Sequence, residues 1–188
     1  MAAGTLAAHY RTMARANRLM NRRLHEAILA LPAAEFTAPR TSFFPSLWAT
    51  LNHILIVDWY YVSALEGRAD MRDAFKSETP CDTMPELSRH QQAVDGRLIA
   101  WCDGASDAAL DAETAMDRAN FVQRDRARHV LDHLFMHQVH HRGQAHAMLS
   151  GTAAKPPQLD EFLMPTDAKF RAADMSALGW AERDLFPD

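Results

Sequence analysis

Histidines recur every four residues along one stretch of the chain, at positions 129, 133, 137 and 141. Residues four apart lie on one face of an α-helix, about 5–6 Å from each other, so this spacing predicts a helix. The helix is expected over residues 126–149, since Gly151 and two prolines follow it. Gly143 in its middle costs about 1 kcal/mol relative to alanine, which predicts that a neighbouring helix approaches closely there.

Three further segments show the apolar spacing of amphipathic helices. They cover residues 6–31, residues from 42–47 to about 65, and residues 85–102. Ser42 and Thr83 are the expected caps at the starts of the last two, while Pro32, Gly67 and Gly104 stand just past the three ends. Together with the histidine-rich segment, these helices predict an all-α fold, a four-helix bundle.

The length of 188 residues suits one domain with a core that needs no disulfides. We expect a single domain over residues 1–188, with the bundle core at about residues 3–151 and a tail at residues 152–188. Because the tail is apolar, it should pack on the bundle or on a second subunit, in short extra helices. Between the helices, residues 67–84 are expected to form a surface loop and residues 105–125 a small hairpin.

Composition argues against several classes of function. The net charge is −4 and no basic face is concentrated, so no nucleic-acid partner is expected. Asn52 and His53 interrupt the most apolar stretch, residues 47–65, which favours a buried helix over a membrane span. The two cysteines form neither a disulfide scaffold nor a CxxC motif. The first residues lack the apolar segment of a signal peptide, so the cytoplasm is the expected location.

The histidine spacing also predicts a metal site, because two histidines four apart on a helix can bind one ion. Each four-residue step drifts by about 40° around a helix, so only adjacent pairs can share the ion. Position alone leaves open whether the pair is His133 with His137 or His137 with His141. His140 is rotated about 100° from His141 and is expected outside the ligand set. Gln138 stands where the common metalloprotease motif has its general-base Glu, which disfavours peptidase chemistry.

A third ligand must come from another helix, and His53 is the best candidate. It lies inside the apolar run of residues 51–57, and a buried imidazole needs a polar partner or a metal ion. The alternative is a hydrogen-bonded core histidine. Three histidine ligands without a fourth protein ligand would leave positions open for water or substrate, the pattern of catalytic rather than structural metal sites.

Two short motifs carry more specific information. Residues 42–58 contain a serine, then Thr-Leu-Asn-His-Ile-Leu, then an acidic residue, and residues 137–144 read His-Gln-Val-His-His-Arg-Gly-Gln. Both motifs resemble those of the DinB superfamily, the DNA-damage-inducible four-helix proteins that include the YfiT-like group. The resemblance extends from about residue 10 to residue 163. It departs at Met136, where the family usually has Asn before the first histidine of the second motif.

The resemblance implies an up-down-down-up bundle, often a dimer, with a metal held by three histidines. Carried over to this chain, the ligands are His53, His137 and His141. Four further residues are candidates for supporting the ligands: Asp58, His133, His140 and Arg142. Two interpretations of Asp58 are equally good. Its carboxylate either orients an imidazole or holds Arg142, or it is simply a charge on the helix surface.

The expected function is that of a metal-dependent enzyme acting on a small molecule, by thiol transfer or by hydrolysis. Relatives in this superfamily use low-molecular-weight thiols in conjugation or isomerisation, and an open site can activate a bound water or thiol. The alternative is a non-catalytic metal-binding stress-response protein, because no general base is identifiable. The metal is expected to be a divalent transition metal, zinc first, with nickel or iron as alternatives. A homodimer is the expected assembly.

Overall fold

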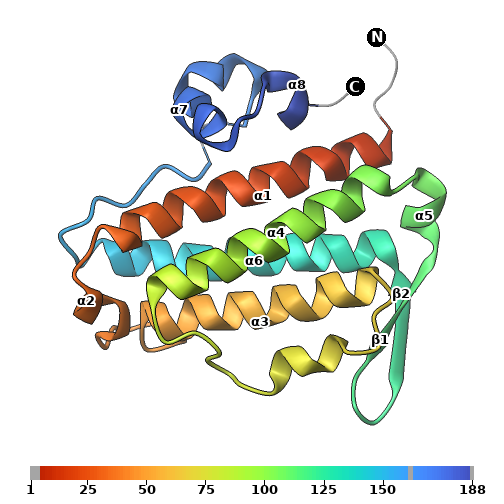
Figure 1. The fold of residues 1–188 in the computed structure, drawn as a ribbon, viewed down its shortest axis with the longest axis horizontal. Coiled ribbons are helices and arrows are strands. Elements are labelled where there is room, and N and C mark those ends of the chain that lie inside the picture. The colour runs from red at the N-terminus through yellow and green to blue at the C-terminus, as the bar shows by residue number, and fades with distance from the viewer. Residues whose placement is uncertain (1–4, 161–162, 187–188) are drawn as a thin grey trace.

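The computed structural model describes residues 5–160 and 163–186. Four long helices form the framework in Figure 1: α1 (Leu6–Leu29), α3 (Leu47–Leu65), α4 (Met84–Gly104) and α6 (Ala127–Leu149). They run along one common long axis, so the predicted all-α bundle is confirmed. The shorter elements are α2 (Ala33–Thr37), η1 (Met71–Phe75), α5 (Asp107–Asp111), β1 (Glu113–Asp117), β2 (Val122–Arg126), η2 (Pro165–Asp167), α7 (Ala168–Leu178) and α8 (Glu182–Leu185).

Capping side chains fix where the long helices begin. Thr83 caps α4 as predicted, and its hydroxyl oxygen accepts from the Glu86 N–H. Helix α3 begins within the predicted range of residues 42–47, but the predicted cap was wrong, because Ser46 rather than Ser42 caps it and accepts from the Ala49 N–H. The chain before Ser46 forms a turn instead, closed by the Arg40 N–H donating to the Pro45 carbonyl.

The glycines at the C-terminal ends of α3 and α4 occupy different positions relative to the helix. Gly67 follows α3 with a φ of 71°, the left-handed conformation that glycine adopts without strain, as expected past a helix end. Gly104 is instead the last residue of α4, because the helix ends where Ala105 takes extended backbone. The expected position of Gly104 outside the helix was therefore wrong by one residue.

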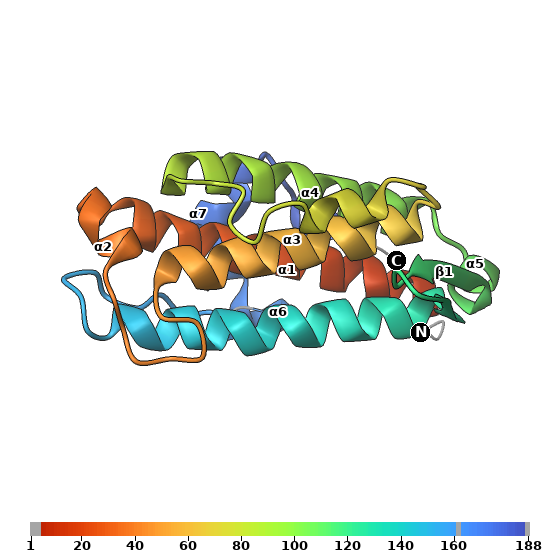
Figure 2. The same ribbon diagram turned by 90° about the horizontal axis from the view of Figure 1, so that it is seen from below.

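Helix α3 lies between α4 and α6 in the view of Figure 2 and packs against both, and also against η1. Most of its residues are buried around the whole circumference, which explains why its sequence is the most apolar of the chain. Within the part of the chain that the structure describes, no helix combines the length and the apolar character needed to cross a membrane.

The two long connections expected between the helices both contain regular secondary structure. The segment at residues 67–84 contains η1, in which Met71 and Ala74 are buried against the core, so the prediction of a plain surface loop was incomplete. The predicted hairpin is present, with β1 antiparallel to β2. It is attached to the bundle by the Tyr60 hydroxyl, which donates to the Asp117 carbonyl at 2.8 Å.

The C-terminal tail packs on the same chain's α1, as Figure 1 shows. Met175 of α7 and Leu185 of α8 are buried against apolar side chains of α1, and Arg23 forms an ion pair with Asp174. The tail thus consists of short helices, as predicted, and its apolar residues form a second, smaller core cluster.

Candidate metal centre

Three imidazoles meet between α3 and α6. His53 projects from α3, while His137 and His141 project from adjacent turns of α6. The Nε2 atoms of His53 and His137 are 3.0 Å apart. The ring centroids of the three side chains lie 4.4–4.9 Å from each other. One nitrogen from each residue lies within 4.8 Å of the others, so the structure brings together the three predicted ligands.

The other histidines of α6 lie outside this group. His133 packs edge-on against Tyr61, with ring centroids 5.0 Å apart, and its own centroid is 6.4 Å from that of His137. His140 is exposed on the outer side of α6. Of the two pairs that spacing left open, the pair facing His53 is therefore His137 with His141.

Burial keeps the three imidazoles neutral. It lowers the pKa of His53 to about 4, with a further contribution from His141. It lowers the pKa of His137 to about 3, again with contributions from the neighbouring imidazoles. For His141 burial also lowers the pKa, although a hydrogen bond to Gln144 opposes the shift. Neutral imidazoles offer a lone pair, which is the form that binds a metal ion.

Gln144 determines which nitrogen of His141 faces the other two histidines. The Nδ1–H of His141 donates to Gln144 Oε1 at 2.8 Å, because an amide oxygen can only accept. This bond fixes the tautomer in which Nε2 carries the lone pair. The Gln144 amide N–H in turn donates to His140 Nε2 at 3.1 Å, so His140 acts on the site through Gln144.

The donor set fits a divalent transition metal. Metal–nitrogen bonds of about 2.0–2.1 Å with tetrahedral angles place two ligand nitrogens about 3.3 Å apart. The separation of 3.0 Å between the His53 and His137 nitrogens is close to that value. Phe44 forms an apolar wall on one side, with its ring centroid 4.5 Å from that of His53. The histidines present here are therefore able to hold such an ion.

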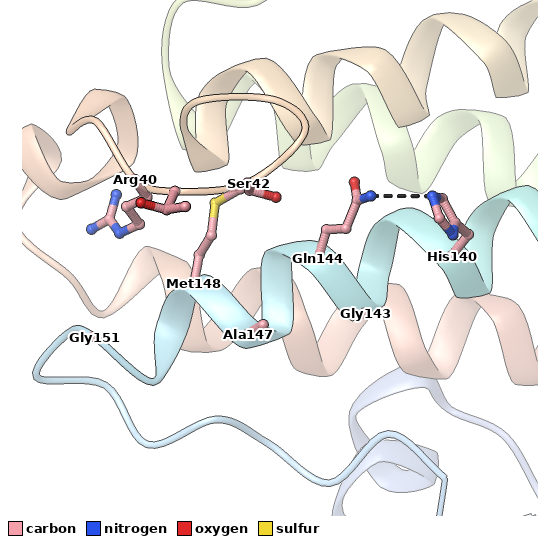
Figure 3. Close-up of a pocket in the computed structure, with 9 residues that line it drawn as sticks. Arg40, Ser42, His140, Gly143, Gln144, Ala147, Met148 and Gly151 are labelled. Carbon is pink, nitrogen blue, oxygen red and sulfur yellow. Dashed lines mark hydrogen bonds between the residues drawn. The ribbon is translucent and has the colours of Figure 1, made fainter.

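An open cleft lies along α6 next to His140 and Gln144 (Figure 3). It has a volume of about 560 Å³ and runs between α6 and the segment that precedes α3. His140 and Gln144 line it on α6, Arg40 and Ser42 line it on the segment before α3, and the three histidines are not among its described lining residues. The guanidinium of Arg40 is held by the carbonyls of Glu35 and Ala38, at 2.7 and 2.9 Å. Gln144 connects this cleft to the three histidines, because it lines the cleft and accepts from the His141 ring.

A comparison with known protein families shows to which family this chain belongs. The model of the DinB family matches residues 2–174, which is most of the chain. The chain belongs to the DinB family. A search of curated proteins gives no match. The resemblance seen in the two sequence motifs is thus confirmed at the level of the family.

Asp58 of this DinB-family chain lies in the bundle interior. Only 2% of its surface is exposed, so the interpretation as a helix-surface charge does not hold. The carboxylate accepts hydrogen bonds from the side-chain amides of Gln91, at 2.6 Å, and of Gln138. These bonds connect it to Arg142 through Gln138 and not to an imidazole.

Arg142 forms the opposite side of the same polar cluster. Its guanidinium donates to Gln138 at 3.0 Å, to Asn21 at 2.8 Å and to Asn17. Asn21 also donates to Asp95 of α4 at 3.0 Å. We call this set the buried polar network: Asn17, Asn21, Asp58, Gln91, Asp95, Gln138 and Arg142. All four long helices contribute to it.

Burial is the largest cause of the pKa shifts in the buried polar network. It raises the pKa of Asp58 to about 8, helped by the nearby charge of Asp95, whereas the hydrogen bond from Gln91 opposes the shift. It also raises the pKa of Asp95 to about 6. The pKa of Arg142 is lowered to about 10 by the same burial, against the attraction of the two carboxylates. The network is therefore a core feature of this DinB-family bundle, and α3 and α6 contribute both to it and to the group of three histidines.

Proposed function

We propose that this DinB-family protein binds one divalent transition-metal ion with His53, His137 and His141 and acts as a metal-dependent enzyme on a small molecule. The observation that supports it is the convergence of three neutral imidazoles, which Gln144 connects to an open cleft. No fourth protein ligand is needed, so coordination positions stay available to water or substrate. Thiol transfer and hydrolysis are the reaction types that such a site serves.

The metal ion, when bound, lowers the pKa of a coordinated water or thiol. The protein's own residues orient the ligands: Gln144 holds the His141 ring, and Phe44 packs against His53 and His141. A protein thiol is not available as nucleophile, because burial raises the pKa of Cys81 to about 11 and that of Cys102 to about 12. A thiol that reacts here would be a low-molecular-weight cosubstrate that enters through the cleft.

Zinc is the first choice for the ion, with nickel or iron as alternatives, because neutral imidazole binds all three. The second candidate function is a non-catalytic metal-binding stress-response protein. One observation favours it: the described lining of the cleft contains no carboxylate that could serve as a general base. In that case the ion would stabilise the contact between α3 and α6 without turnover.

We further propose that the protein is a homodimer that uses the outer face of α6. Met136 and Val139 are 69% and 53% exposed on this face. Gly143 lies on the same helix, and a Cβ added to it would meet no other atom within 4 Å. The close helix approach that this glycine predicts is absent within the described chain, so a second copy of the chain is the proposed neighbour.

The proposed function is tested by titrating metal-free protein with Zn²⁺ and comparing His141→Ala with the matched variant His140→Ala. We expect His141→Ala to lose at least about a hundredfold in affinity, and His140→Ala to lose no more than about tenfold because it acts through Gln144. The zinc-loaded parent is then assayed with low-molecular-weight thiols and electrophiles and with small ester and amide substrates. Turnover supports the enzyme, whereas tight binding without turnover supports the second candidate. Equal losses in both variants would contradict the ligand assignment.

A further inference from the structure

A second group of metal-ligating side chains lies at the start of α4, separate from the three histidines. It consists of Cys81 in the preceding loop, and of Glu86 and His90 on the helix. One ligand atom from each of the three residues lies within 4.8 Å of the others. A thiol, a carboxylate and an imidazole from two neighbouring segments thus converge on one point.

The position of Cys81 is fixed by hydrogen bonds from α3. Its N–H donates to Asn52 Oδ1 at 2.9 Å, and its carbonyl accepts from Asn52 Nδ2 at 3.0 Å. The same carbonyl accepts from Trp48 Nε1 at 2.7 Å. Asn52 is itself fully buried. The loop is therefore held rigidly, and Cys81 is preorganised at the start of α4.

Glu86 and His90 are one turn apart on α4, so they lie on one helix face. The Glu86 carboxylate accepts from the Asp82 N–H at 3.2 Å, which turns it back toward the loop that carries Cys81. His90 packs edge-on against Trp59 of α3, with ring centroids 5.4 Å apart. Both side chains are half-buried, so solvent and ions reach the group from outside.

The charges of Glu86 and Arg89 act on the Cys81 thiol in opposite directions. Burial raises the pKa of the Cys81 thiol, and the negative charge of Glu86 raises it further. The exposed guanidinium of Arg89 lies on the outer side, where its Nη2 is 2.9 Å from His90 Nε2. An ion that binds here would take the place of this guanidinium and offset the negative charge of a thiolate beside a carboxylate.

We propose that Cys81, Glu86 and His90 form a second metal site, selective for a borderline-soft divalent ion such as Zn²⁺. Sulfur, nitrogen and one carboxylate oxygen are the ligands that zinc accepts in tetrahedral sites, with water in the fourth position. Binding forms a metal–sulfur bond and releases the thiol proton of Cys81 to solvent. The site would fix the loop before α4 on the helix and does not depend on the proposed function of the three histidines.

Co²⁺ is the probe that distinguishes the two sites, because only thiolate ligation produces a sulfur-to-cobalt charge-transfer band in the near ultraviolet. Titration of the metal-free full-length chain should bind two equivalents and develop this band. Cys81→Ser should abolish the band, and the matched variant Cys102→Ser should retain it. The double variant His53→Ala/His137→Ala, which removes the first site, should also retain the band.

Glu86→Gln and His90→Ala change half-buried positions and test the site without altering a buried residue. Each should weaken the Co²⁺ affinity measured by the band at least about tenfold, with unchanged helix content in circular dichroism. The proposal is overturned if the saturated parent lacks the band, if the band survives in Cys81→Ser, or if both α4 variants bind Co²⁺ as tightly as the parent.

Discussion

Asp58 illustrates how a single buried residue can set a property of the whole fold. Its carboxylate lies among the helices with the carboxylate of Asp95 and the guanidinium of Arg142 as the charged groups facing it, and amides supply its hydrogen bonds. Among the described residues, its Oδ1 has no hydrogen-bond partner. A buried carboxylate with one unpaired oxygen favours the protonated form.

Asp58→Asn is therefore expected to change the pH dependence of stability. The folded-state pKa is raised from 3.8 to about 8. A raised pKa means that this carboxyl contributes stability fully below the unfolded value and loses it as pH rises toward 8. Asparagine does not ionise, so the variant does not lose stability in this way. The difference in free energy of unfolding, variant minus parent, should therefore increase by about 1–3 kcal/mol between pH 5 and pH 8. Urea unfolding at several pH values measures it.

Glu66→Gln provides the control for this experiment, because Glu66 pairs with Arg97 at the surface. Its stability difference from the parent should vary little over the same pH range. A difference between Asp58→Asn and the parent that stays constant or shrinks as pH rises would contradict the protonated state assigned to Asp58.

The residues of the candidate site divide into those that spacing can predict and those that it cannot. His137 and His141 were predictable as one of two helical pairs, and His53 as an imidazole in an apolar run. Phe44 gave no such signal, because it lies outside any helix and contacts His53 only through the folded chain. Gln144 stood inside the recognised motif, but its bond to His141 depends on side-chain rotamers.

Among the elements, α6 places different chemistry on different faces. His137 and His141 face α3, Arg142 enters the bundle interior, and Met136 with Val139 faces solvent. A rotation of about 100° per residue separates neighbouring side chains, so consecutive residues of one motif serve different environments. The same geometry explains why His140 and His141 differ in burial although they are adjacent.

Gly143→Ala tests the outer face of α6. A mid-helix glycine is less favourable than alanine, and a Cβ here meets nothing within 4 Å in the described chain. An isolated chain should therefore gain about 0.5–1 kcal/mol in the free energy of unfolding. Gly96→Ala on α4 is the matched variant, since its Cβ would meet only Arg18 at 3.7 Å.

Sedimentation of both variants completes this test. If a second copy packs on α6, Gly143→Ala should weaken the dimer while Gly96→Ala leaves it unchanged. A parent that sediments as a monomer at micromolar concentration would rule out the proposed homodimer.

The elements themselves were largely readable from the sequence. Apolar periodicity and capping residues located the four long helices to within a few residues, because these signals are local. The start of α3 lies within the predicted range, but its cap was missed, since the turn at residues 40–45 places Ser46 rather than Ser42 at the helix start. η1 was missed for a related reason: Met71 and Ala74 are held by tertiary packing rather than by a periodic pattern.

At the scale of the whole molecule, the tail extends the core beyond the four long helices. Met175 and Leu185 cover Leu19 and Met20 on the side of α1 that faces away from the main core cluster. Without the tail, this apolar side of α1 would be exposed to water. The sequence left two possible locations for the tail, because its apolar composition does not specify a partner.

Leu185→Ala measures this contribution. Leu185 is fully buried, so its truncation should lower the free energy of unfolding by about 2–4 kcal/mol. Phe170→Ala is the control, because Phe170 is 59% exposed and its loss should change stability by no more than about 0.5 kcal/mol. Similar small effects in both variants, measured by chemical denaturation, would argue that the tail does not pack on α1 in solution.

The buried polar network also fixes how far each long helix can slide along its neighbours. A shift of α6 by one turn, about 5.4 Å, would move Arg142 away from Asn17 and Asn21 of α1 and would break the hydrogen bonds that these amides accept from the buried guanidinium. Apolar contacts alone would tolerate such a shift, since leucine and alanine pack against many neighbours. The axial register of the bundle is thus set by a few polar side chains, and in that register His53 lies level with the two histidines of α6.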